Sequence, residues 1–266
     1  HTECCVMAPK YCGGQLDIHA GGEDLIFPHH ENEIAQYEAA HGERFAHYWM
    51  HNAFINIDNK KMSKSLGNFF TVRDVTAEFD PMVLRFYMLS AHYRSPLNFS
   101  KELMQSAKAS LDRILHAIWH LEDLYPRLKK EQCSKEEEEN LKKAEAYVAT
   151  FSEKMEDDLN TADAITQIFE LVRLSNASAG EDSSQDFVEK MKNSIVTLMQ
   201  VLGIRTEKKE EELDDSLEEK VTALIQKRTE AKKNKDFAEA DRIRDQLLEM
   251  GIALKDTRNG VEWQKI

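Results

Sequence analysis

The sequence is poor in cysteine and has no long apolar run, and each shortage excludes a class of protein. No apolar stretch approaches the roughly 18 residues of a membrane-spanning helix, so we expect no membrane contact. The chain opens at His1 with neither an initiator Met nor the segments of a secretory signal, and we interpret it as a fragment. Cys4, Cys5, Cys12 and Cys133 form a poor disulfide framework, which favours a reducing cytoplasm and metal ligation.

Basic residues are also in deficit. The chain has 35 Lys and Arg against 48 Asp and Glu, a formal net charge of -13. A uniformly acidic surface repels nucleic acid, so RNA would have to bind at a local basic patch. From Ser216 to the end there are 11 Lys and Arg against 10 Asp and Glu, so the acidic excess belongs to the preceding residues. The C-terminal segment is therefore the candidate RNA-binding region.

A chain of 266 residues is long enough for two or three domains. From Ser100 onward, apolar residues recur three and four positions apart, which predicts a helix packed in a bundle. That seam consists of Met104, Ala107, Leu111, Ile114, Ile118, Leu121 and Tyr125. Further bundle helices are expected over 136–157, 161–178 and 187–202. A charged linker should follow, and then a helix over 236–250 and a hairpin that turns at Asn259-Gly260.

The first part of the chain mixes short apolar runs with glycine and histidine. We predict a strand over 15–19, a turn at Gly21-Gly22, and a helix from Pro28 that Gly42 ends. A second strand is expected over 52–57. Thr71 and Asp74 have the spacing of a capping box, which predicts a helix after a polar loop at 58–70.

His29 and Glu33 are a candidate metal-binding pair. They lie four residues apart in the predicted helix, so both side chains project from one face. By itself this spacing favours an ordinary His–Glu ion pair. Together with Cys4, however, the pair offers sulfur, nitrogen and oxygen ligands suited to Zn2+. The competing ligands are Cys5, Cys12 and His30.

The strongest local signal is Lys61-Met62-Ser63-Lys64-Ser65. Two ammonium groups on a polar loop can hold a triphosphate and follow its charge as pyrophosphate departs. Charge alone would indicate an ordinary basic surface loop, with Lys60 as a third cation. The order of the residues, and not their charge, indicates a phosphate site.

Residues 61–65 resemble the signature loop of class I aminoacyl-tRNA synthetases. Residues 21–33, GGEDLIFPHHENE, together with 1–4, are similar to the bacterial type of cysteinyl-tRNA synthetase. The similarity continues through 48–51, 91–100 and 238–245, and it covers nearly the whole chain.

The resemblance implies specific roles in the site. Cys4, His29 and Glu33 correspond to three of the family's four zinc ligands. His19 and His30 would contact these ligands without binding the ion. Asp24, Lys61, Ser63, Lys64 and Ser65 would bind ATP, which Mg2+ accompanies, and Lys61 and Lys64 would be catalytic. The family's fourth ligand, a Cys, and its HIGH-type motif lie upstream of His1, so we expect this chain alone to be impaired or inactive in adenylation.

The implied activity is that of a cysteine–tRNA ligase, a cytoplasmic and monomeric enzyme acting on L-cysteine, ATP and tRNA(Cys). The implied fold is multidomain and mainly α. We expect the C-terminal half of a Rossmann-like α/β catalytic domain, then an α-helical bundle and a small α+β module. The expected boundaries are 1–70 for the catalytic part, 71–99 for a connecting region that contacts the tRNA stem, 100–205 for the tRNA-binding bundle, 206–215 for the linker and 216–266 for the anticodon-binding module.

Candidate tRNA contacts lie in that last module. They are Arg228, Lys232, Lys233, Arg242, Arg244, Arg258 and Trp263. Alternating charges around Arg242 are equally typical of a salt-bridged exposed helix face. Two other functions stay open at this point: a cysteine ligase acting on a small amine, which the long tail disfavours, and a non-catalytic tRNA-binding fragment.

Overall fold

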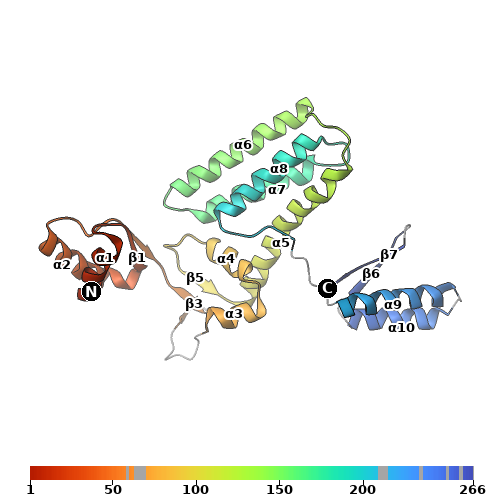
Figure 1. The fold of residues 1–266 in the computed structure, drawn as a ribbon, viewed down its shortest axis with the longest axis horizontal. Helices are drawn as coiled ribbons and strands as arrows, with labels where there is room; N and C mark the ends of the chain where they lie inside the picture. The colour runs from red at the N-terminus through yellow and green to blue at the C-terminus, as the bar shows by residue number, and fades with distance from the viewer. Residues whose placement is uncertain are drawn as a thin grey trace. The chain divides into compact units, whose positions relative to one another are not determined.

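The computed structural model describes residues 1–57, 60–62, 70–208, 215–233, 236–249, 252–257 and 260–265. The chain forms two compact units, His1–Thr206 and Glu207–Ile266. Helices dominate both units, as the sequence predicts (Figure 1). None of the helices in the described ranges has the length and apolarity required to cross a bilayer.

The first unit begins with a small α/β layer. Helix α1 (Thr2–Cys12) precedes strand β1 (Leu16–Gly22), helix α2 (Glu31–His41) and strand β2 (Ala46–Asn52). The two strands pair in parallel, with Leu16 opposite Ala46 and Gly21 opposite His51. A parallel pair needs a crossover connection, and α2 supplies it. Cys5 of α1 and Tyr37 of α2 pack together with Phe45, which precedes β2, and these three residues form the core of this layer.

Two details of the predicted layer are wrong. Gly21 and Gly22 continue β1 and do not form a turn. The helix begins at Glu31, because 26–30 form a π-helical segment (Ile26–His30) that follows a 3-10 turn (Glu23–Leu25). Its end is as predicted, since Gly42 adopts the left-handed conformation (φ 74°) that ends many helices.

A second sheet joins this layer to the bundle. The predicted strand at 52–57 is in fact the end of β2 followed by a separate strand, β3 (Ile55–Ile57). Strand β3 pairs antiparallel with β4 (Lys60–Lys61) and parallel with β5 (Leu97–Phe99). Helices α3 (Val72–Glu78) and α4 (Pro81–Leu89) lie between these strands in sequence, and Thr71 and Asp74 form the predicted capping box at the start of α3.

The bundle consists of α5 (Lys101–Leu124), α6 (Lys135–Glu156), α7 (Thr161–Ser178) and α8 (Gln185–Val201); a 3-10 turn, Tyr125–Arg127, follows α5 (Figure 1). The predicted seam of α5 is buried from Met104 to Leu121, whereas Tyr125 is 38% exposed because the helix has ended before it. Residue Gly203 closes α8 with φ 66°, and the Nε of Arg85 donates a 2.7 Å hydrogen bond to the carbonyl of Leu202 there.

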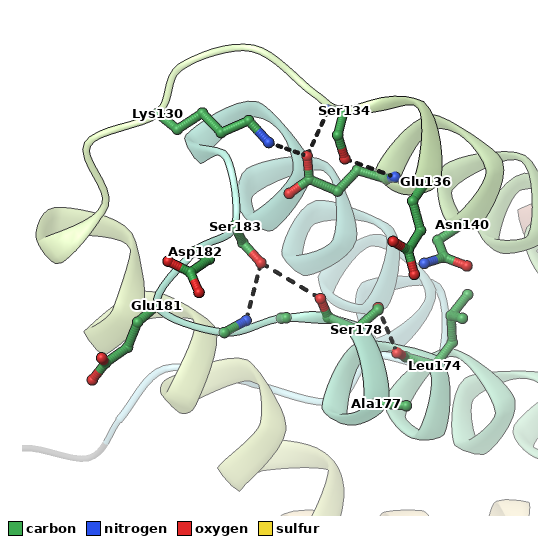
Figure 2. A pocket seen from close by; sticks show the side chains of 13 residues that line it. Lys130, Ser134, Glu136, Asn140, Leu174, Ala177, Ser178, Glu181, Asp182 and Ser183 are labelled. Atoms are coloured by element: carbon green, nitrogen blue, oxygen red, sulfur yellow. Dashed lines mark hydrogen bonds and ion pairs between the residues drawn. The ribbon is translucent and has the colours of Figure 1, made fainter.

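A buried carboxylate braces two loops at one end of the bundle. One oxygen of Glu137 accepts hydrogen bonds from Ser134 N (2.7 Å) and Lys130 Nζ (3.1 Å). The other accepts from Ser184 N at 2.8 Å. Figure 2 shows Lys130 and Ser134 converging from the α5–α6 connection. The brace therefore ties that connection to the start of α8.

The second unit is described by itself. Helix α9 (Asp215–Lys233) packs on α10 (Phe237–Glu249), and strands β6 (Ile252–Thr257) and β7 (Gly260–Lys265) form an antiparallel hairpin. Its small core contains Val221, Ile243, Leu247 and Ile252. The predicted hairpin is present, while Asn259 of the predicted turn lies outside the described residues.

Candidate functional site

Side chains from three separate elements meet around Glu33. This residue lies on the first turn of α2, Cys4 lies on α1, and His19 lies on β1. His29 and His30 come from the segment before α2. Because α1 packs on α2 and β1 leads into it, residues nearly 30 positions apart in sequence are brought together.

The distances suit metal binding by two overlapping sets. Cys4, His29 and Glu33 each offer one ligand atom, and these atoms lie within 4.8 Å of one another. His19, His30 and Glu33 satisfy the same limit. Bonds of about 2.0 to 2.3 Å to tetrahedral zinc place the ligand atoms roughly 3.3 to 3.8 Å apart, so only a small contraction is needed.

Glu33 is fully buried, yet only one of its oxygens is hydrogen-bonded. Its Oε2 accepts from His19 Nε2 at 2.9 Å. Its Oε1 has no hydrogen-bond partner, although His29 Nε2 lies 3.3 Å away. Burying an unpaired carboxylate oxygen is costly, and a cation at this position would remove the cost. The orphaned oxygen lies on the side of His29, which favours the set with Cys4.

Burial and charge act on the neighbouring groups. Burial raises the pKa of the Cys4 thiol, and the nearby Glu33 carboxylate raises it further. Burial also lowers the pKa of His30, and the nearby His19 adds to this effect. The protein alone therefore holds Cys4 as a thiol and His30 as a neutral imidazole, and a divalent cation would be needed to favour the thiolate.

The competing cysteines lie elsewhere. Cys5 is buried and donates a hydrogen bond from Sγ to the backbone carbonyl of Glu33 at 3.3 Å, so it belongs to the core. Cys12 is exposed at the end of α1. Neither residue is in a cluster of metal-ligating groups among the described residues.

Two site residues were missed by the sequence analysis. His51 forms a 2.8 Å hydrogen bond with Nδ1 of His30, and the Trp49 ring lies 4.8 Å from the ring of His19 and 5.1 Å from that of His30. Both come from β2, which pairs in parallel with β1. The two residues alternate along that strand, and this alternation is the signal that could have found them.

The glycine opposite His51 has a steric role at the site. A Cβ on Gly21 would lie 2.8 Å from Cε1 of His30 and 2.9 Å from the Leu25 side chain. Only glycine therefore lets His30 approach the strand closely. Asp24, one of the candidate ATP-binding residues, is exposed on the turn that follows β1.

The predicted nucleotide loop is only partly described. Lys61 forms strand β4 with Lys60, but Ser63, Lys64 and Ser65 lie outside the described residues. In the second unit, Arg228 is 5% exposed, which disfavours a direct RNA contact through its side chain. Arg242 and Arg244 are both exposed. The Nη2 of Arg242 lies 3.1 Å from Oε1 of Glu239. Of the other predicted contacts, Lys232, Lys233 and Trp263 have described backbones only, and Arg258 lies outside the described residues.

A cavity of about 560 Å3 lies in the bundle, and Glu137 is one of the residues that line it. Glu136 and Asn140 lie on one side of it, and Glu181 and Asp182 lie on the other (Figure 2). These carboxylates are not in a cluster with metal-ligand spacing in the part of the chain that was searched. The site around Glu33 is therefore the stronger candidate.

Three family models match successive parts of the chain. Residues 1–109 match the catalytic domain of class I (C) tRNA synthetases. Residues 150–207 match the DALR domain. Residues 214–263 match the cysteinyl-tRNA ligase anticodon-binding domain.

Curated relatives and a solved structure agree with these matches. Cysteine–tRNA ligases from Lachnospira eligens, Lachnoclostridium phytofermentans and Clostridioides difficile are 56%, 53% and 51% identical to the chain. Each match covers the whole chain but only 55–57% of the relative, so the chain spans little more than half of their length. A LeuRS–tRNA–LeuAMS complex from Agrobacterium radiobacter has a TM-score of 0.60 over 69% of this chain and 25% of its own, at 19% identity, which supports the fold.

Proposed function

Because the chain belongs to the cysteine–tRNA ligase family of class I synthetases, we propose that the whole protein activates cysteine with ATP and transfers it to tRNA(Cys). ATP and tRNA would be its substrates, as the matches to a class I synthetase catalytic domain and to an anticodon-binding domain support. The convergence of Cys4, His29 and Glu33 is the observation on which this proposal depends.

These three residues fit a zinc ion. They offer a sulfur, a nitrogen and an oxygen, and the unpaired Oε1 of Glu33 faces the side on which His29 lies. His19 would orient Glu33 through its 2.9 Å hydrogen bond, and His30, held by His51, would pack behind the ligands. When bound, zinc with an open position would favour the cysteine thiolate over the serine hydroxyl, which a shape-based pocket separates by only about 1 to 3 kcal/mol.

Two reaction steps follow from this assignment. In the first, the cysteine carboxylate oxygen attacks the α-phosphate of ATP, a bond to phosphorus forms and pyrophosphate leaves with its electron pair. In the second, a hydroxyl oxygen of the tRNA terminal ribose attacks the cysteinyl carbonyl carbon. The ester bond forms, AMP leaves with the electron pair of the anhydride bond, and the hydroxyl proton is released.

The residues of this chain act by binding and charge. Lys61 and Lys64 would meet the charge that builds on the departing pyrophosphate, with Ser63 and Ser65 on the same loop and Mg2+ on the nucleotide. Asp24 would hold the adenosine ribose. Its exposed position, on the turn just after the carboxyl end of β1, supports that role, because open α/β sheets bind ligands at that edge.

We propose that tRNA contacts the bundle and the second unit. We also propose that the protein is a monomer, with domain boundaries at residues 70, 99, 205 and 215. The match of 214–263 to an anticodon-binding domain supports this assignment. Exposed Arg242 and Arg244 are the candidates best supported by their surroundings. The same match disfavours a ligase that acts on a small amine, because such an enzyme needs no anticodon contact.

Metal analysis of the full-length protein tests the zinc assignment. We expect about one Zn2+ per chain, and Cys4→Ser should reduce it to well below half because a hydroxyl is a poor zinc ligand. Cys12→Ser is the matched control, since Cys12 is exposed and outside the cluster. Equal zinc contents in the two variants would refute the ligand assignment, and a lack of cysteine-dependent exchange between ATP and pyrophosphate would refute the proposed activity.

A further inference from the structure

The turn between α6 and α7 has an unusual backbone. Asp158 and Leu159 both adopt left-handed conformations, with φ of 55° and 54°. Helices commonly end in this conformation, but usually on glycine, and a bulky residue such as leucine rarely adopts it. Such strain persists only where surrounding contacts impose it. The contacts of Asp158 therefore need an explanation beyond the ending of a helix.

Those contacts come from a distant segment, His92–Arg94. The Tyr93 hydroxyl donates a 2.7 Å hydrogen bond to Oδ1 of Asp158. Arg94 Nη2 lies 2.9 Å from Oδ2 of the same carboxylate, and His92 Nε2 lies 3.8 Å from it. The Nε of Arg94 also donates to the Tyr93 hydroxyl at 3.0 Å. The carboxylate is thus engaged through both oxygens.

Tyr93 links this turn to the candidate site. Its backbone carbonyl accepts a 2.9 Å hydrogen bond from the amide of Ala53, the residue after the last residue of β2. Two positions earlier on β2 is His51, which is hydrogen-bonded to His30 beside Glu33. One tyrosine therefore contacts both the residue that follows β2 and the corner of the helical bundle.

Packing between these two regions is incomplete. A cavity of about 300 Å3 is lined by Ala20 and Met50 from the strands, Met88 from α4, and Leu159 and Thr161 from the bundle corner. Because this open pocket separates the apolar side chains that line it, their mutual packing contributes little to the spacing of the two regions. The two hydrogen bonds of Tyr93 and the ion pair of Arg94 with Asp158 span these regions.

We propose that Asp158 is a positioning residue for transfer of cysteine to tRNA. Through Tyr93 and Arg94 it fixes the bundle, α5–α8, relative to the carboxyl ends of β1 and β2. A tRNA held by the bundle then presents its terminal ribose at the reacting carbonyl. This inference rests on the proposed function, and it assigns Asp158 no contact with substrate.

Measuring adenylation and transfer to tRNA separately distinguishes a positioning role of Asp158 from a merely structural one. In the full-length protein, Asp158→Ala should lower the single-turnover rate of transfer from preformed adenylate to tRNA at least tenfold. Cysteine-dependent exchange between ATP and pyrophosphate should stay within twofold, because among the described residues the side chain of Asp158 bonds to His92, Tyr93 and Arg94 and not to Cys4, His29 or Glu33. The rate at saturating tRNA should fall more than the KM for tRNA rises.

Conservative variants keep the test valid if Asp158→Ala folds poorly. Asn tolerates the left-handed conformation and keeps an acceptor for Tyr93 but loses the charge, so Asp158→Asn should slow transfer about threefold. Tyr93→Phe should slow it nearly as much as Asp158→Ala, and the double variant should be no slower than Asp158→Ala. Asp112→Ala is the control, because Asp112 has similar exposure and an ion pair with Lys108 within α5.

Two results would overturn the inference. Transfer by Asp158→Ala within twofold of the unsubstituted protein would show that the network positions nothing. Equal losses in both half-reactions, with additive effects of Tyr93→Phe, would show a merely structural role. If the unsubstituted protein catalysed no cysteine-dependent exchange at all, the proposed function itself would be at fault.

Discussion

The Glu137 brace predicts how stability depends on one buried carboxylate. Burial by itself raises the pKa of Glu137, but hydrogen bonds from Ser134, Ser184 and Lys130 outweigh burial and lower the pKa from 4.5 to about 2. A difference of about 2.5 pKa units corresponds to roughly 3 kcal/mol of folding free energy at neutral pH. The Glu137 side chain is 10% exposed, so solvent screens the interaction little.

We therefore expect Glu137→Gln to destabilise the first unit by about 3 kcal/mol at pH 7. Glutamine matches the shape of glutamate, but an NH2 group replaces one of the two carboxylate oxygens. An NH2 group cannot accept the hydrogen bonds that this oxygen accepts. Because the pKa is lowered in the folded state, the contribution is complete above the unfolded pKa near 4.5 and is lost as the pH falls toward 2. At pH 3 it should be about 1.4 kcal/mol.

Urea unfolding followed by circular dichroism at pH 7, 5, 4 and 3 measures this dependence. Glu138→Gln is the matched control, since Glu138 is exposed on the same first turn of α6. We expect that control to change stability by less than about 0.5 kcal/mol. A Glu137→Gln deficit that equals the control, or one that stays constant from pH 7 to pH 3, would refute the reasoning.

Two further predictions concern the candidate site and its loop. Gly21→Ala should displace His30 from His51 and weaken zinc binding about 10- to 100-fold, as measured in competition with a chelator. Gly180→Ala is the control, because a Cβ there meets no atom within 4 Å and should leave zinc affinity unchanged. Unchanged zinc affinity in Gly21→Ala would contradict the steric argument. Lys64→Ala should slow adenylation more than tenfold in pre-steady-state kinetics while cysteine affinity changes little, because the charge on pyrophosphate develops only in the transition state. Equal losses in adenylation rate and in cysteine affinity would indicate a structural loop.

The helical bundle could be predicted well because its signals are local. The apolar seam of α5 and the capping box at Thr71 and Asp74 depend on residues within a few positions of one another. The ending at Gly42 is local in the same sense. Each of these predictions is confirmed, since helix periodicity and caps are properties of short segments.

The predicted turn at Gly21-Gly22 is wrong for a non-local reason. Gly21 and Gly22 read as a turn by composition, but pairing with His51 and Asn52 makes them part of a strand. Backbone pairing with a segment some 30 residues away overrides the local preference, and a single sequence does not reveal that partner.

The sequence by itself determined the types of candidate ligand atom, the helical seam and the family resemblance, because these depend on residue identity and spacing. Only the tertiary structure decided that Cys4, and neither Cys5 nor Cys12, clusters with the carboxylate of Glu33, that His51 and Trp49 contact the histidines, and that Tyr93 reaches Asp158. Those relations arise where α1 packs on α2 and where β1 pairs with β2. Distances between segments far apart in the chain are set by packing, which the order of residues does not state.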